Sequence, residues 1–147
     1  MSSSKFWRRT SAGITSTNSR EWIESVLRTY VDSWANGAVE TRLDLFADDI
    51  VMEDPATVLR ASNKVELSQF FRAGIPADWQ LSFAFIRCAI VGDEAILTYQ
   101  STLSTGTNSA AQLLINSHLV FNQEGKINRM RVFWDGESIT DQLTSGQ

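Results

Sequence analysis

Asp54 and Tyr30 are the residues of this chain whose type and setting best suit acid–base chemistry. Asp54 follows an apolar segment and precedes Pro55. Because side chains alternate along a strand, Asp54 shares one face with Ile50 and Met52. A carboxylate that faces an apolar cavity must be paired, shifted in pKa or used in chemistry. The same pattern is also typical of a turn-forming aspartate before proline, and the segment alone favours that interpretation.

Tyr30 lies on the apolar stripe of a predicted helix. Trp22, Val26, Tyr30 and Trp34 recur at helical spacing, which places them on one buried face. A tyrosine in such a position is usually a core ring whose hydroxyl is bonded to a polar group. By itself, Tyr30 therefore does not indicate a function.

The elements that must position these residues fall into a helical block and a block of strands. The chain has 147 residues, about one domain. Helices are predicted from a cap at Asn18 or Ser19 to Asn36-Gly37, over 39–46, and from a cap at Asn63 to residue 71. Strands are predicted over 50–53, 81–90, 94–104, 113–121 and 126–134, with a longer loop over 105–110. Helices followed by a meander of antiparallel strands predict an α+β fold with helices packed on one sheet face.

The domain limits follow from where periodicity begins and ends. Residues 1–18 are rich in Ser and Thr without periodicity and predict a flexible head. A single domain is expected over 19–136, followed by a tail over 137–147.

Composition narrows the classes of partner. The net charge is −4 and the pI about 4.9, which argues against binding nucleic acid or anionic membranes. One cysteine (Cys88, predicted to be buried and inert) and one histidine (His118) make a zinc site of the usual kind difficult to build, and we expect no metal and no cofactor. Without a secretory signal or a membrane-spanning stretch, a cytoplasmic location is expected.

Several segments together resemble the ketosteroid isomerases of the NTF2-like superfamily. These are Tyr30-Val31, Asn36-Gly37, Leu45-Phe46-Ala47-Asp48-Asp49, Val51-Met52-Glu53-Asp54-Pro55, Phe121-Asn122-Gln123-Glu124-Gly125-Lys126-Ile127 and Met130-Arg131. The spacing from Tyr30 to Asp54 matches the family's without a gap, and the likeness covers roughly residues 20–135. Each motif alone is weakly specific.

The resemblance implies a cone-shaped barrel, usually a homodimer, that isomerises 3-oxo-Δ5-steroids without a cofactor. It implies that Asp54 is the general base and that Tyr30 donates a hydrogen bond to the dienolate oxygen. Ketosteroid isomerase is itself the standard example of an oxyanion hole built from a tyrosine and a protonated aspartic acid. In this chain the position of that second acid falls on Ser117, or on Asn116 after a slip of one residue, and either is a weaker donor.

The remaining site residues are an expected apolar lining and a set of polar residues without a catalytic role. The lining is predicted to comprise Trp34, Met52, Phe71, Tyr99, Leu103, Ile115, Met130, Val132 and Trp134, although most of these also suit ordinary core packing. His118 and Glu53 are expected on the opposite sheet face, and Asp48 and Asp49 in a turn.

Alternative functions on the same scaffold remain open. A SnoaL-like polyketide cyclase needs little more than one acid–base group and is compatible with the sequence. An epoxide hydrolase needs two carboxylates around an arginine and a scytalone-type dehydratase needs pocket histidines, so both are disfavoured. The third class is a dimeric module that binds small hydrophobic ligands without catalysis, because a fold does not determine a function.

Overall fold

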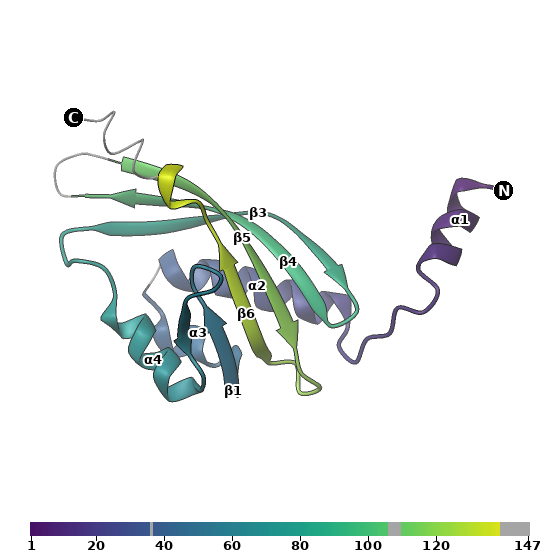
Figure 1. Cartoon of the computed structure of the whole chain (residues 1–147), viewed down its shortest axis with the longest axis horizontal. Helices are drawn as coiled ribbons and strands as arrows, with labels where there is room; N and C mark the ends of the chain where they lie inside the picture. Colours follow the sequence, from purple (N-terminus) through teal and green to yellow (C-terminus); the bar gives the residue numbers. More distant parts are fainter. Residues whose placement is uncertain (36, 106–109, 139–147) are drawn as a thin grey trace.

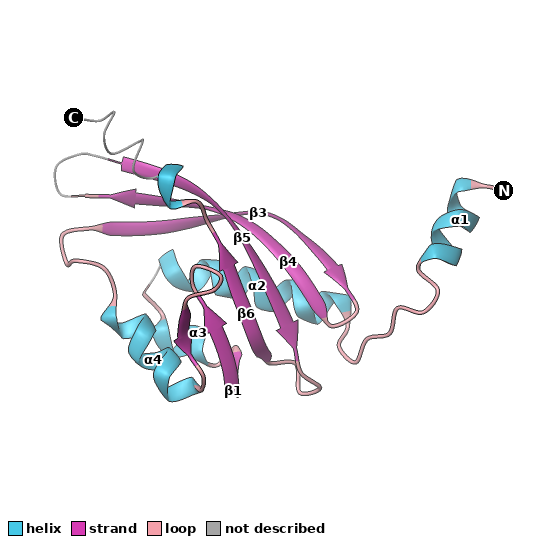
Figure 2. Cartoon of the chain, viewed as in Figure 1, coloured by secondary structure: helices cyan, strands magenta, loops and turns pink. Residues whose placement is uncertain are grey.

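The protein is a curved sheet with helices packed on one face (Figures 1 and 2). The computed structural model describes residues 1–35, 37–105 and 110–138. The elements in chain order are α1 (Ser3–Thr10), α2 (Arg20–Ala35), α3 (Val39–Leu43), β1 (Phe46–Glu53), β2 (Leu59–Ala61), α4 (Lys64–Ala73), β3 (Gln80–Val91), β4 (Glu94–Ser104), β5 (Ala110–Phe121) and β6 (Ile127–Phe133). The predicted α+β class is confirmed.

The sheet is mixed and open, whereas the resemblance implied an antiparallel cone-shaped barrel. Its six strands follow the order β2-β1-β6-β5-β4-β3, and β2 and β3 are its two edges. Strand β1 pairs in parallel with β6, where Met52 lies opposite Met130, and the other pairs are antiparallel. Two parallel strands must be joined by a long crossover, which here comprises all the elements from β2 to β5. A prediction that joins each strand to the next by a hairpin therefore misses the β1–β6 pair.

Two predicted helix caps are confirmed by hydrogen bonds. Ser19 Oγ accepts the backbone N–H of Trp22 at 3.1 Å at the start of α2. Asn63 Oδ1 accepts the N–H of Glu66 at 2.9 Å at the start of α4. Asn18, the alternative cap, instead donates its side-chain N–H to Asp93 and so ties the start of α2 to the β3–β4 turn.

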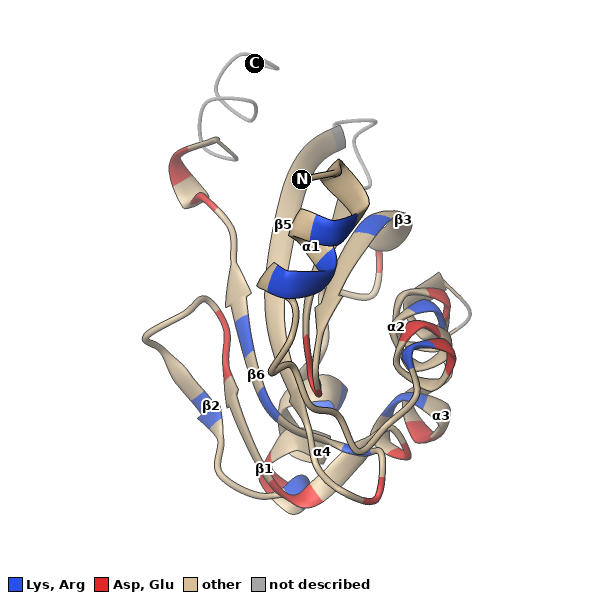
Figure 3. Cartoon of the chain, turned by 90° about the vertical axis from the view of Figure 1, so that its right-hand side faces the viewer, with Lys and Arg blue, Asp and Glu red and all other residues tan. Residues whose placement is uncertain are grey.

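The core lies between α2 and the inner face of the sheet, and Figure 3 shows α2 almost end-on beside that sheet. The predicted alternation along β1 holds, since Ile50 and Met52 are 0% and 1% exposed while Val51 is 38% exposed. Asp54 follows on the same face as Ile50 and Met52, and its side chain therefore points toward the helices.

The sequence does not predict two short elements of the structure. Helix α1 forms within the head that was predicted to lack regular structure, and all its side chains are exposed because it lies apart from the rest of the chain (Figure 1). Strand β2 has only three residues and forms against β1. Asn36, most of the predicted 105–110 loop and residues 139–147 of the predicted tail lie outside the described residues.

Candidate active site

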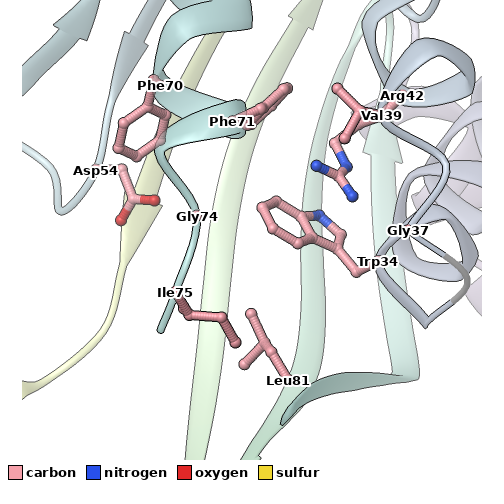
Figure 4. A pocket seen from close by; sticks show the side chains of 10 residues that line it. All are labelled: Trp34, Gly37, Val39, Arg42, Asp54, Phe70, Phe71, Gly74, Ile75 and Leu81. Carbon is pink, nitrogen blue, oxygen red and sulfur yellow. The ribbon is translucent and has the colours of Figure 1, made fainter. Parts of the chain in front are cut away.

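A cavity of about 430 Å³ lies between the helices and the end of β1. Its size falls within the range of small-molecule sites. The lining residues are Trp34, Gly37, Val39, Arg42, Asp54, Phe70, Phe71, Gly74, Ile75 and Leu81. In Figure 4 the Asp54 carboxylate lies on one side of this space, while Trp34 and the Arg42 guanidinium lie on the other. The cavity is thus apolar with one acidic and one basic group.

Asp54 is positioned by contacts on both its backbone and its side chain. Its N–H donates to the carbonyl of Val58 at 3.0 Å, and its own carbonyl accepts Arg60 Nε at 2.7 Å. Its Oδ1 accepts the indole N–H of Trp134 at 2.7 Å, while Oδ2 has no hydrogen bond within the described residues. One carboxylate oxygen is therefore held and the other is available to a ligand.

The environment of Asp54 makes its carboxylate more basic than an ordinary aspartate. Burial raises its pKa, while the hydrogen bond from Trp134 and the charge of Arg60 act in the opposite direction. Burial dominates because the charged form loses hydration that one hydrogen bond only partly replaces. A raised pKa on a carboxylate in an apolar cavity is what proton abstraction requires.

Tyr30 lies in the core beside this cavity and is not among the residues that line it. Its ring packs edge-on against Trp34 and Tyr99, with centroids 6.3 Å away in both cases. Burial, and next the negative charge of Asp54, raise the pKa of Tyr30 to about 12. Tyr30 is therefore a neutral hydrogen-bond donor at physiological pH.

Ser117, the expected second donor, is completely buried and bonds to another tyrosine. Its Oγ lies 3.2 Å from the hydroxyl of Tyr99. Burial, and next the repulsion that an ionised Tyr30 would exert, raise the pKa of Tyr99 well above its ordinary value. Ser117 therefore bonds to Tyr99 and is not among the residues that line the cavity. Asn116, the alternative after a one-residue slip, accepts the Thr98 hydroxyl at 2.7 Å.

Arg42 is a charged residue of the cavity that the sequence does not predict there. It is only 2% exposed, and its Cζ lies 3.5 Å from the ring centre of Trp34 and 4.9 Å from that of Phe71. Its Nε and Nη2 donate to the hydroxyl and carbonyl oxygens of Ser33, both at 3.1 Å. Its place three residues after Val39, on the apolar stripe of a short helix, was the signal that could have revealed it.

The other predicted lining residues do not gather at this cavity. Of the predicted lining only Trp34 and Phe71 contribute to it. The buried core holds Met52, Tyr99, Ile115, Met130 and Val132, while Leu103 and Trp134 are half-buried. Trp134 nevertheless contacts the site through its bond to Asp54.

The polar residues without an expected catalytic role do not line the cavity, and Asp48 and Asp49 lie within strand β1 and not in the expected turn. His118 Nε2 lies 2.7 Å from Glu94, and Glu53 accepts the Arg131 Nε at 3.0 Å. Cys88 is half-buried and packs against the core, and burial raises the pKa of its thiol. Across the described ranges, no three His, Cys, Asp or Glu side chains gather as ligands for a metal ion. Nor is any helix in those ranges long and apolar enough to span a membrane.

The curved sheet with helices packed against it is the fold of the SnoaL-like domains. The model of the SnoaL-like domain family matches residues 27–130, and the chain belongs to that family. No curated protein sequence matches the chain.

Solved structures with several different activities resemble this chain. A protein from Kribbella flavida named as a candidate ketosteroid isomerase is 26% identical, with a TM-score of 0.60 and 78% of each chain covered. The Δ5-3-ketosteroid isomerase of a Mycobacterium species is 18% identical, with a TM-score of 0.68 over 80% of this chain and 95% of that one. An LEH-like epoxide hydrolase from Mycobacterium tuberculosis is 15% identical, with a TM-score of 0.73 over 86% and 92%. Structures named as candidate polyketide cyclases are similar as well.

Proposed function

We propose that the chain is an acid–base enzyme that moves a proton within a small hydrophobic ketone bound in the Asp54 cavity. The observation that carries the proposal is the half-buried Asp54 carboxylate, held through one oxygen by Trp134 and facing an apolar cavity. Its raised pKa supports the role of general base.

The reaction that fits best is an allylic isomerisation through a dienolate. Asp54 takes a proton from the carbon next to the carbonyl group and returns it two carbons further along the conjugated system, so that no atom is gained or lost. Tyr30 stabilises the negative charge on the oxygen, a role supported by its neutral state and by its ring contact with Trp34, which lines the cavity. The substrate class, an unsaturated ketone of steroid-like size, follows from the resemblance to ketosteroid isomerases.

A ring closure of the polyketide-cyclase type is the second candidate. It also begins with proton abstraction next to a carbonyl and needs only one acid–base residue, which is what the cavity offers. Family membership supports both reactions equally.

The ultraviolet absorbance of a Δ5-3-ketosteroid tests the isomerase directly, because the conjugated product absorbs where the substrate does not. Wild type should convert the steroid, and Asp54→Asn should lower the rate by about 10²–10⁴-fold, the usual contribution of a general base. Asp49→Asn, an exposed aspartate on β1, is the matched control and should keep the wild-type rate. If wild type binds the steroid and does not convert it, the isomerase is refuted and the binding of hydrophobic ligands without catalysis becomes the supported function.

We also propose a homodimer formed through the outer face of the sheet. Ile96, Leu114 and Phe133 lie on strands β4, β5 and β6 of this face and are 44%, 54% and 46% exposed. Burying such side chains between two copies is favourable. Sedimentation should show a dimer that Leu114→Glu weakens; a wild-type monomer at micromolar concentration would refute the dimer.

A further inference from the structure

Arg42 is a buried cation without a counter-charge. Within the described ranges no carboxylate lies within salt-bridge distance of its guanidinium, and its hydrogen bonds go only to neutral oxygens of Ser33. A buried charge loses its hydration and is retained when something else compensates for that loss. Two aromatic rings compensate only in part, because a cation–π contact is weaker than an ion pair.

The carboxylate across the cavity does not neutralise this cation. Asp54 lies on the opposite side of the cavity (Figure 4), and Arg42 is not among the groups that shift its pKa. The two charges therefore mark two separate ends of the same apolar space. A ligand that spans it meets a base at one end and a cation at the other.

The guanidinium has one edge left for a ligand. Trp34 and Phe71 lie against it, and Ser33 occupies Nε and Nη2, whereas Nη1 makes no hydrogen bond within the described part of the chain. The bonds to Ser33 fix the orientation of the Arg42 guanidinium before a ligand binds, so that little side-chain entropy is lost on binding.

We propose that the cavity binds an apolar molecule that carries a carboxylate, and that Arg42 recognises this carboxylate. The inference deepens the proposed function and rests on it in one respect: the same molecule presents its ketone to Asp54, so that the substrate is a hydrophobic keto acid. A carboxylate matches the site better than a phosphate, because Arg42 is the one cation among the described residues that line the cavity, and it balances one negative charge and not two.

Binding of a matched pair of probes tests the inference without any catalysis. 2-Naphthaleneacetic acid and 2-naphthaleneacetamide have the same apolar ring and differ in charge at pH 7. Quenching of tryptophan fluorescence or calorimetry gives both dissociation constants. We expect wild type to bind the acid about 10–100-fold more tightly than the amide, as a charge-assisted hydrogen bond supplies. Equal affinities would overturn the inference.

Variants of Arg42 test whether this residue causes the preference for the acid. Arg42→Gln should abolish it, whereas Arg72→Gln should keep it, because Arg72 is an exposed cation on α4 that pairs with Glu40. A folded Arg42→Gln protein that still prefers the acid would show that the carboxylate is recognised elsewhere and would refute the role of Arg42. Should Arg42→Gln fail to fold, ¹⁵N NMR of arginine-labelled wild type decides: the acid, and not the amide, should shift the Arg42 Nε–H signal, and an unmoved signal would refute the inference.

The same probes separate this inference from the proposed proton transfer. Asp54→Asn should retain the preference for the acid, because Arg42 is unchanged. If wild type prefers the acid but isomerises no ketone, the carboxylate site is supported and the isomerase is refuted. If it isomerises a neutral ketone but shows no preference for the acid, the isomerase is supported and the carboxylate site is refuted.

Discussion

Replacing Trp134 by phenylalanine removes the hydrogen bond that holds Oδ1 of Asp54. The two heavy atoms are 2.7 Å apart, which is the length of a charge-assisted bond. Such a bond favours the ionised carboxylate and so lowers its pKa; its loss must raise the pKa further. Hydrogen bonds to charged groups contribute about 1.5–3 kcal/mol. Because Asp54 is half-buried and water can replace part of the indole, we expect about 1–2 kcal/mol here.

A ¹³C NMR titration of aspartate-labelled protein measures this effect directly, with the Asp54 signal assigned by its loss in Asp54→Asn. The midpoint of that signal should move to higher pH in Trp134→Phe, and the acid limb of any activity profile should move with it. Trp7→Phe, which changes an exposed ring on α1, should leave the midpoint where it is in wild type. A midpoint that stays in place or moves to lower pH in Trp134→Phe would refute the view that the indole stabilises the ionised Asp54 carboxylate.

Three further predictions concern Tyr30, Asp54 and Gly125. Tyr30→Phe should lower the rate of isomerisation by about 10²-fold in steady-state kinetics, since it removes one oxyanion donor, and an unchanged rate would remove Tyr30 from the mechanism. Asp54→Asn should be more stable than wild type at pH 7 in urea denaturation; because the folded-state pKa of Asp54 is raised, ionisation costs stability, and the advantage should vanish as pH falls through that pKa toward 3.8. An advantage independent of pH would contradict this origin. Gly125→Ala should cost about 2–3 kcal/mol of unfolding free energy, because φ is +78° and the new Cβ would lie 2.4 Å from Trp22 Nε1. Gly37→Ala, with φ at +66° and open space around it, should cost only about 1 kcal/mol, and equal costs would show that the contact with Trp22 is unimportant.

Local patterns revealed most of the fold because each depends on neighbours in the chain. The caps at Ser19 and Asn63, the α2 stripe and the four long strands are all determined within a few residues. The parallel pairing of β1 with β6 depends on residues far apart in sequence, and nothing in the strands themselves encodes it. Helix α1 buries none of its side chains, so that its sequence carries no stripe of apolar residues facing a core.

The candidate site was predicted in part for the same reason. Asp54 could be placed on an apolar face from the alternation of Ile50 and Met52. Its partner Trp134 lies 80 residues away, and only the folded structure brings the two together. The sequence does not predict Arg42 in the cavity, because a charged residue in a short helix usually faces solvent.

Hydrogen exchange at the carbon next to a bound carbonyl tests most directly whether Asp54 moves a proton in this cavity. A saturated 3-ketosteroid in D₂O, followed by proton NMR, needs no correctly placed double bond and reports proton abstraction alone. Wild type should exchange these protons well above the rate in buffer, and Asp54→Asn should return the rate to that of buffer. A ketone that binds and does not exchange, or that exchanges equally fast in Asp54→Asn, would contradict the account.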